Sequence, residues 1–259
     1  MTKSAPALLP QSYARTAGIL YLVIAVLGAF SIAYIPSVII AAGDPASTAA
    51  NLMAHRTLFG LGAFADVVVM LTEIVLAVML FVIFKPVSLT LSLIAMVSRL
   101  AMVLVMAVNL LIHITPVVLL SGADYLSAFS PEQLQAAAMV FFEGHQLGVY
   151  VWDMFFGFTL FVTGYLIIQS GWFPRLLGGA MMVGSFGYFL EGLTHVTFLE
   201  NGTLELVIGG LLVVISLSEL AFALWLLIKG LNSGAQGKTL AAPMFGSRQD
   251  STLAGGALR

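Results

Sequence analysis

Carboxylic acids lie inside the apolar stretches of this chain, where they could bind a proton, a metal cation or the amine of a solute. Between residues 141 and 153, one such stretch carries Glu143, Gln146, Tyr150 and Asp153. At about 100° per residue, these four side chains fall within a stripe of roughly 80° on one face of a helix. A helix whose face contacted only lipid would not keep such a stripe. The sequence therefore predicts that polar groups of other helices lie opposite it.

Acidic residues greatly outnumber basic ones in these stretches. Arg99 is opposed by seven acids, namely Asp66, Glu73, Glu143, Asp153, Glu191, Glu205 and Glu219. An ionised group in the middle of a bilayer costs roughly 2.5–3.5 kcal/mol, so these side chains are expected to point into a shared polar interior. We expect Arg99 to pair with Asp66, Glu73 or Asp153, and the other acids to be protonated, hydrated or neutralised by an external cation. The interior or ligand candidates are Asp66, Glu73, Arg99, Asn109, Glu143, Gln146, Tyr150, Asp153, Glu191 and Glu219.

Three histidines from three different stretches suggest a second kind of chemistry. Counted inward from the expected outer ends of the spans at 1.5 Å per residue, His113, His145 and His195 all lie about 6–10 Å deep. With Glu191, one helical turn before His195, they could hold Zn²⁺ or a similar ion with a position open for water, and two of them could hold a haem. Against a single centre, His145 lies about 160° around its helix from Glu143, and the chain has no HExxH motif. Histidines in ordinary interfacial hydrogen bonds are the simpler alternative, so no cofactor is firmly implied, and a metal or a haem stays open.

The composition defines the class of protein. Hydrophobic residues make up 60% of the chain and charged residues 8%, whereas soluble domains carry about 25% charged residues. The chain is therefore an integral membrane protein whose first partner is the lipid bilayer. It has no cysteine, which excludes disulfides, thiolate metal sites and thiol chemistry. The sequence also lacks a phosphate-binding loop, a dinucleotide fingerprint, a nucleophile elbow and any basic patch suited to nucleic acid.

Six apolar stretches are long enough to cross a bilayer. The predicted fold is all-α, a polytopic bundle of six transmembrane helices with short loops. The membrane domain covers residues 13–229, between an N-terminal segment at 1–12 and a tail at 230–259 whose Gly, Ala and Ser content predicts disorder. The spans are expected at 16–42, 57–84, 88–119, 138–169, 175–199 and 203–228.

Two outer loops carry signals that start helices. Asp44-Pro45 predicts a short helix at the outer surface, and Ser130-Pro131 with Gln133 predicts a capping box that begins the fourth long helix before it enters lipid. The first span offers few polar side chains to the interior, and we expect it at the periphery of the bundle.

The basic residues predict the orientation in the membrane. If the chain has six spans, the Lys and Arg residues at the ends of the spans or outside them fall on the same side as the two termini. Arg56 is the one exception. Lys and Arg concentrate in cytoplasmic loops, so both termini are expected in the cytoplasm and the protein in a bacterial inner membrane.

Several runs of sequence resemble a known family. These runs are residues 155–178 (FFGFTLFVTGYLIIQSGWFPRLLG), 14–21 (ARTAGILY) and 187–191 (GYFLE). They are similar to a bacterial family of six-helix membrane proteins catalogued as domain of unknown function 4386. The resemblance implies the fold and the membrane location, and it implies no activity. Members often have His where this chain has Thr159 and Asp where it has Glu191, and the first departure argues against a fixed histidine site.

Three functions fit these patterns. The acid-rich interior predicts binding or transport of a proton, a cation or a small amine-bearing solute. The histidines suggest instead a metal- or haem-dependent enzyme that acts at the outer leaflet. A third alternative is a structural protein whose interior is a network of protonated acids with one ion pair, and whose loops bind a protein that the sequence does not identify. We favour binding over catalysis.

Overall fold

Six long apolar helices form the bundle, as the sequence predicts. In the computed structural model, which describes residues 8–237 apart from 200, 233 and 235, each span has a mean hydropathy between 1.3 and 2.9. Lipid offers no hydrogen bonds to the backbone, so an apolar segment of this length satisfies its own peptide groups as a helix. The shortest span has 22 residues, or about 33 Å, which is enough for a hydrocarbon core of about 30 Å. The spans are Gln11–Ile39, α4 (Arg56–Phe84), α5 (Leu89–Leu119), α6 (Pro131–Ser170), α7 (Arg175–Val196) and α8 (Gly202–Ile228).

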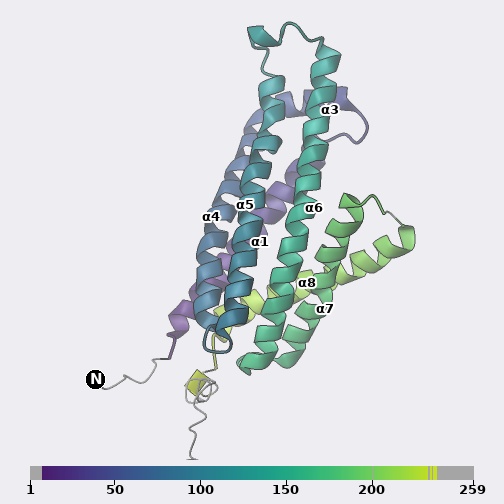
Figure 1. Cartoon of the computed structure of the whole chain (residues 1–259). Coiled ribbons are helices and arrows are strands. Elements are labelled where there is room, and N and C mark those ends of the chain that lie inside the picture. Colours follow the sequence, from purple (N-terminus) through teal and green to yellow (C-terminus); the bar gives the residue numbers. More distant parts are fainter. Residues whose placement is uncertain (1–7, 200, 233, 235, 238–259) are drawn as a thin grey trace, which may run out of the picture.

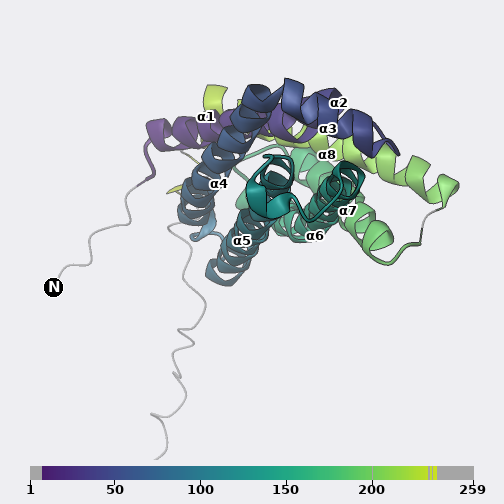
Figure 2. The ribbon, with the colours of Figure 1, turned by 90° about the horizontal axis from the view of Figure 1, so that it is seen from above.

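The first span is not a uniform α-helix. It consists of α1 (Gln11–Gly28), a π-helical segment η1 (Ala29–Tyr34) and a short α2 (Ile35–Ile39). With 22% of its apolar window buried, the first span is the least buried of the six, and α1 packs against both α4 and α8 to close the ring of helices. Figure 2 shows α1 and α8 along one side of the bundle, with α4 beside α1.

The two predicted helix starts are confirmed. α3 (Pro45–Ala54) begins after Asp44, whose carboxylate accepts a hydrogen bond from the backbone N–H of Ser47 at 3.0 Å. At the start of α6, Gln133 donates its N–H to the Ser130 hydroxyl at 3.3 Å, and its side chain accepts from the Ser130 N–H at 2.8 Å. Both caps satisfy backbone groups that a helix leaves unpaired at its first turn.

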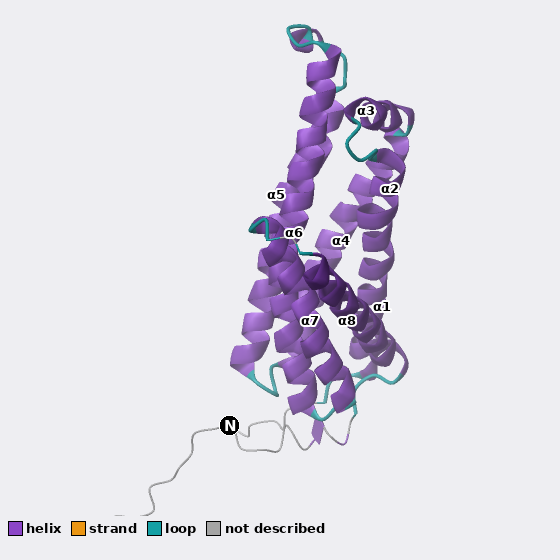
Figure 3. Ribbon diagram, turned by 90° about the vertical axis from the view of Figure 1, so that its right-hand side faces the viewer, coloured by secondary structure: helices purple, strands orange, loops and turns teal. Residues whose placement is uncertain are grey.

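The helices differ greatly in length, which makes the bundle uneven. α6 has 40 residues, or about 60 Å, whereas its neighbour α7 has 22, or about 33 Å. Figures 1 and 3 show the α7–α8 connection partway along the bundle, while α3 and the α5–α6 connection lie well beyond it. We call the end that carries α3 the α3 end. The α4–α5 connection and both described ends of the chain lie at the opposite end (Figure 1).

Glycines allow the closest helix contacts, as expected from the small residues on the inward faces. A Cβ atom added to Gly164 on α6 would lie 2.7 Å from the carbonyl oxygen of Gly178 on α7, and the reverse addition would give 2.6 Å. A Cβ on Gly184 of α7 would lie 2.6 Å from the backbone N of Ile215 on α8. The backbones of α6, α7 and α8 therefore touch directly, which holds these three helices in one arrangement.

The apolar core is densest at the end opposite α3. There the ring of Phe84 stacks on those of Trp172 and Phe222, with centroids 6.3 and 6.5 Å apart. The start of the expected tail also packs here, because the Gln11 side chain donates to the Leu231 carbonyl at 2.6 Å and accepts from its N–H at 3.0 Å. Residues 238–259, to which the predicted disorder mainly refers, lie outside the described residues, as do residues 1–7.

Candidate functional site

A cavity of about 620 Å³ lies at the centre of the bundle and is lined by all six spans. Most of its wall is apolar, and a set of polar side chains projects into it. Nine of the candidates chosen from sequence are among them, which brings together residues separated by more than 150 positions. The candidates in the wall are Asp66, Glu73, Arg99, His145, Gln146, Tyr150, Asp153, Glu191 and Glu219.

One ion pair is buried in this wall. Arg99 on α5 is 1% exposed and donates two hydrogen bonds to Glu73 on α4, at 2.5 Å from Nε and 3.1 Å from Nη2. Its guanidinium carbon lies 5.1 Å from the ring centroid of Tyr21 and 5.6 Å from that of Phe156, which adds cation–π attraction. Of the three partners expected for Arg99, the structure selects Glu73. This is the single ion pair among the described residues, although Arg99 also attracts Glu219 and His195 attracts Glu191 at longer range.

Glu219 on α8 takes a different partner. The Tyr21 hydroxyl of α1 donates to a Glu219 carboxyl oxygen at 2.8 Å, and the Tyr21 ring meets the ring of Phe222 edge-on at 5.9 Å. Tyr21 therefore ties α1 to α8 at the wall of the cavity. Sequence reasoning did not select Tyr21, although a tyrosine in the middle of an otherwise apolar span is a signal that its hydroxyl has a polar partner.

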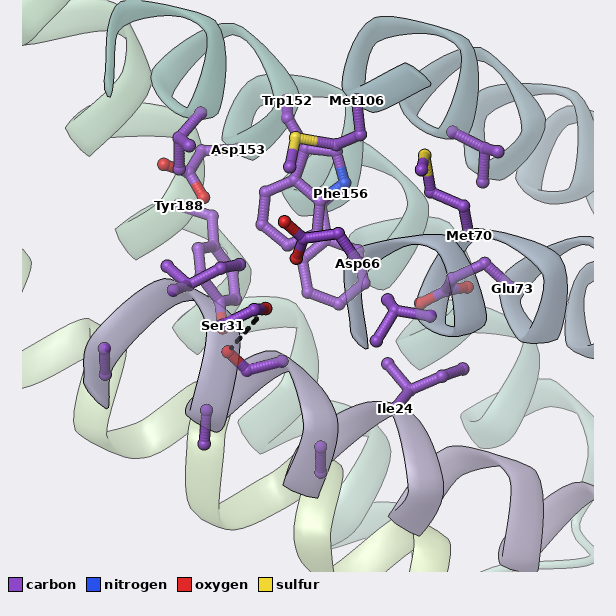
Figure 4. Close-up of a pocket in the computed structure, with 18 of the residues that line it drawn as sticks. Ile24, Ser31, Asp66, Met70, Glu73, Met106, Trp152, Asp153, Phe156 and Tyr188 are labelled. Atoms are coloured by element: carbon purple, nitrogen blue, oxygen red, sulfur yellow. Dashed lines mark hydrogen bonds between the residues drawn. The ribbon is translucent and has the colours of Figure 1, made fainter. Parts of the chain in front are cut away.

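Asp66, Asp153 and Glu191 are the acids that remain. Asp153 is 3% exposed and experiences the charge of Glu191 across the α6–α7 interface, while Asp66 lies beside the hydroxyl of Ser31 in η1. Figure 4 shows Asp66 from α4 and Asp153 from α6 extending into the same space. Ionised carboxylates in one poorly solvated cavity repel each other, so a proton or a cation placed among them is stabilised.

Aromatic rings line the larger cavity beside these acids. Trp152 and Phe156 stack with centroids 4.7 Å apart, and Phe156 lies 5.1 Å from Tyr188. These rings surround the space into which Asp66 and Asp153 point (Figure 4). Ring faces attract cations, so carboxylates beside aromatic faces form a surface that suits an ammonium group. The sequence analysis did not select Trp152. It is next to Asp153 in the chain but lies on a different face of an ideal helix.

A second, smaller cavity of about 140 Å³ adjoins the first toward the α3 end. His113 of α5 and His145 of α6 meet there with ring centroids 4.1 Å apart, and Phe59 stacks on His113 at 4.7 Å. Glu143 lines this smaller cavity and is exposed. The stripe predicted on α6 therefore serves two cavities, with Glu143 at one, Asp153 in the other, and Gln146 in the wall of both.

The four proposed metal ligands are divided between two places. His195 stacks on Tyr150 at 4.0 Å, and its Nδ1 lies 2.9 Å from the carbonyl oxygen of Glu191 in its own helix, apart from the His113–His145 pair. Within the part of the chain that the structure describes, no three His, Asp or Glu side chains are arranged to hold a metal ion. A haem does not fit between His113 and His145 either, because two imidazoles in direct contact leave no room for iron and its macrocycle.

Asn109 has a structural contact instead of a place in either cavity. Its Nδ2 donates to the backbone carbonyl of His145 at 2.9 Å, and the amide group packs directly on Gly148. Asn109 is buried, so this contact positions α5 against α6 beside the histidine pair. A polar residue inside a membrane span often bonds a neighbouring helix in this way.

The match to known proteins covers the whole membrane part of the chain. The family model of DUF4386, a domain of unknown function, matches residues 16–230. The chain belongs to the DUF4386 family. In this DUF4386 protein the matched region runs from within α1 to just past the end of α8, so every span that lines the cavity is included.

The similar protein found for this DUF4386 chain has no described activity. It is similar to an uncharacterized protein of Archaeoglobus fulgidus, with 33% identity over 81 residues, which is 30% of this chain and 43% of that relative's length. No solved structure matches the chain. The family description and this relative carry no function, so a proposal depends on the chemistry of the cavity.

Proposed function

We propose that this protein binds a small solute that carries an amine or another organic cation, and that the larger cavity is its binding site. The observation that carries the proposal is the charge of the wall. Five carboxyl groups line the cavity, and among the described residues a single ion pair serves one of them. A cationic solute would neutralise the surplus and would also contact the aromatic faces.

The size of the cavity favours an organic cation over a bare metal ion. About 620 Å³ lies within the range of roughly 300–1,000 Å³ that is typical of small-molecule sites with apolar walls and a few polar groups. A hard metal ion such as Ca²⁺ takes about six to eight oxygen ligands at short range, and the acids of the cavity project from different helices toward an open space. The solute we propose therefore has an apolar body in addition to its ammonium group.

Each polar group has a role in this proposal. Asp153 and Glu191, which are close enough to interact as charges, hold the ammonium group, and Asp66 approaches it from α4. The Arg99–Glu73 pair supports the wall, since its charges already neutralise each other. Trp152 and its neighbouring rings contact the apolar body and the cation.

Proton binding is a second function that one observation favours. Asp153 and Glu191 interact as like charges, and a proton shared between them removes the repulsion without any solute. The two functions differ in what they require from the rest of the cavity, because a proton needs neither the volume nor the aromatic wall.

We also propose that the protein lies in a bacterial plasma membrane with both termini in the cytoplasm. This is supported by the exposed basic residues Arg15, Lys85, Arg175 and Lys229, which belong to the end opposite α3, while Arg56 follows α3. Positive charge concentrates on the cytoplasmic side of membrane proteins. The α3 end is then the outer end.

The test is a binding experiment on the purified full chain in lipid nanodiscs. The probes are a series of amines from tetramethylammonium to phenethylamine, added at constant ionic strength and followed by thermal shift and calorimetry. We expect a member of the series to bind the natural protein and to lose affinity by about tenfold or more in Asp153→Asn, which is about 1.4 kcal/mol. Glu205→Gln is the matched control, because Glu205 is an exposed acid of α8 outside the cavity.

Two results would contradict amine binding. One is the absence of binding across the series, and the other is equal affinity in the natural protein and in Asp153→Asn. Proton release or uptake by the same samples, measured with a pH dye, then tests the second function. Proton binding requires that this release or uptake is lost in Asp153→Asn and kept in Glu205→Gln.

A further inference from the structure

The two cavities lie next to each other and share part of their walls. Ile32, His145, Gln146 and Val149 line both the larger and the smaller cavity, so the same four side chains form the partition between them. The smaller cavity lies toward the α3 end, because His113 is 14 residues further along α5 than Arg99, or about 21 Å. A solute that passed this partition from the α3 end would arrive among the acids of the larger cavity.

The short α7–α8 hairpin leaves this path uncovered. α7 ends at Val196, and its last turn packs at Tyr150 of α6, so the part of α6 nearer its N-terminus extends past α7. Figures 1 and 3 show the same relation, with the α7–α8 connection well short of the α3 end. Glu143 and Gln146 lie in this uncovered part of α6, and both are exposed.

The walls of the smaller cavity suit a cationic group in transit. Glu143 is an exposed carboxylate at its side, and the imidazole rings of His113 and His145 form part of its wall. A neutral imidazole presents one nitrogen lone pair, which accepts a hydrogen bond from an ammonium group. A wall with a negative charge also raises the local concentration of cations relative to anions.

We infer that the smaller cavity is the vestibule of the larger one: the solute enters from the α3 end past Glu143, and His145 and Gln146 form the constriction between the two spaces. The inference rests on the proposed function for the positive charge of the solute, whereas the route itself rests on the shared walls. A competing route runs between α1 and α8, where the exposed Ser216 and Leu220 also line the larger cavity. That route would lead a cation through lipid, which is unfavourable.

The natural chain has no cysteine, so single cysteines report access directly. Gln146→Cys examines the constriction and Met70→Cys the larger cavity next to Glu73, while Leu104→Cys, 69% exposed on the outer surface of α5, is the lipid-facing control. Membrane-impermeant thiol reagents of equal size, one cationic and one anionic, are applied to sealed vesicles of both orientations. His55→Cys and Lys85→Cys mark the α3 end and the opposite end.

We expect Gln146→Cys and Met70→Cys to react from the face that reaches His55→Cys, and the cationic reagent to react about tenfold or more faster than the anionic one. Adding Glu143→Gln should bring the two rates closer together. Adding Gln146→Trp should slow modification of Met70→Cys by about tenfold or more, whereas Val140→Trp, 65% exposed elsewhere on α6, should leave it unchanged. Ile32→Phe in the same partition repeats the test if Gln146→Trp lowers the melting temperature.

Modification of Met70→Cys from the Lys85 face, or at an unchanged rate after the partition is filled, would overturn the vestibule. The rates require no bound amine. The vestibule can therefore fail while Asp153-dependent amine binding persists, and amine binding can fail while the access route is upheld.

Discussion

Arg99 and Glu73 join α5 to α4 through two hydrogen bonds in the wall of the central cavity, and Glu73 neutralises the positive charge that Arg99 brings to this wall. The other acids of the cavity form no ion pair among the described residues, and Glu219 instead accepts a hydrogen bond from Tyr21. The ion pair stabilises the packing of two helices of this DUF4386 protein. The carboxyl groups left over suit the cationic ligand that we propose.

Removing one member of the pair should destabilise the protein more than removing both. Arg99→Met leaves the Glu73 carboxylate buried without its partner, which typically costs about 3–5 kcal/mol, whereas a neutral pair of similar volume costs much less. We therefore expect Arg99→Met to lower the free energy of unfolding in mixed micelles, and Arg99→Met with Glu73→Gln to regain most of the loss. Arg56→Met, at an exposed position, is the control. Additive losses in the double variant would show that the pair is not coupled.

Tyr21→Phe should loosen the attachment of α1 to α8. The substitution removes the hydroxyl that donates to Glu219 at 2.8 Å and keeps the ring that meets Phe222. A net loss of about 0.5–1.5 kcal/mol in the free energy of unfolding is expected for one such hydrogen bond. Tyr125→Phe in the α5–α6 connection, where the ring is exposed, should change nothing. Equal stability of both variants would mean that the Tyr21 hydroxyl adds nothing to packing.

Gly192→Ala should separate α7 from α6 at the cavity. A Cβ atom at this position would collide with the backbone carbonyl oxygen of Tyr150, which cannot move without shifting α6. We expect a loss of about 1–3 kcal/mol, as for other overpacked sites. Gly209→Ala on α8 meets open space and should be neutral or slightly stabilising, because Ala favours the helix by up to about 1 kcal/mol over Gly. The melting temperatures of the two variants, measured side by side, check this contrast.

The cap of α3 should depend on pH. Hydrogen bonds from the Ser47 hydroxyl and N–H lower the pKa of Asp44 below its usual value of 3.8. A lowered pKa in the folded state means that the charged cap stabilises α3 above the unfolded pKa and that this stabilisation is lost as the pH falls through the folded pKa. Amide exchange in residues 45–54, corrected for intrinsic rates, should therefore be slower at pH 7 than at pH 3. Asp44→Asn keeps a capping oxygen that does not titrate, so its protection should not change between these pH values.

The sequence by itself determined the class of the protein, the number of its spans and the inward direction of five of the seven acids in its spans, whereas Glu143 and Glu205 are exposed. These follow from the cost of placing charge and unpaired backbone in lipid, which acts on each segment separately. The same local reasoning identified the caps at Asp44 and Ser130, because a cap involves residues only three positions apart. The spacing of Gln146, Tyr150 and Asp153 also predicted one polar face, and all three line the larger cavity.

Only the tertiary structure decided how the helices are rotated and how far each one slides along its neighbours. Asp66, Glu73 and Asp153 are equal partners for Arg99 by sequence, and the packing of α4 against α5 brings Glu73 within hydrogen-bond distance of it. The short α7 sets His195 beside Tyr150 while the longer α5 and α6 join His113 to His145, so histidines at similar sequence depth end in different places. Helix rotation and offset depend on contacts between residues far apart in the chain, which the spacing within one helix does not report.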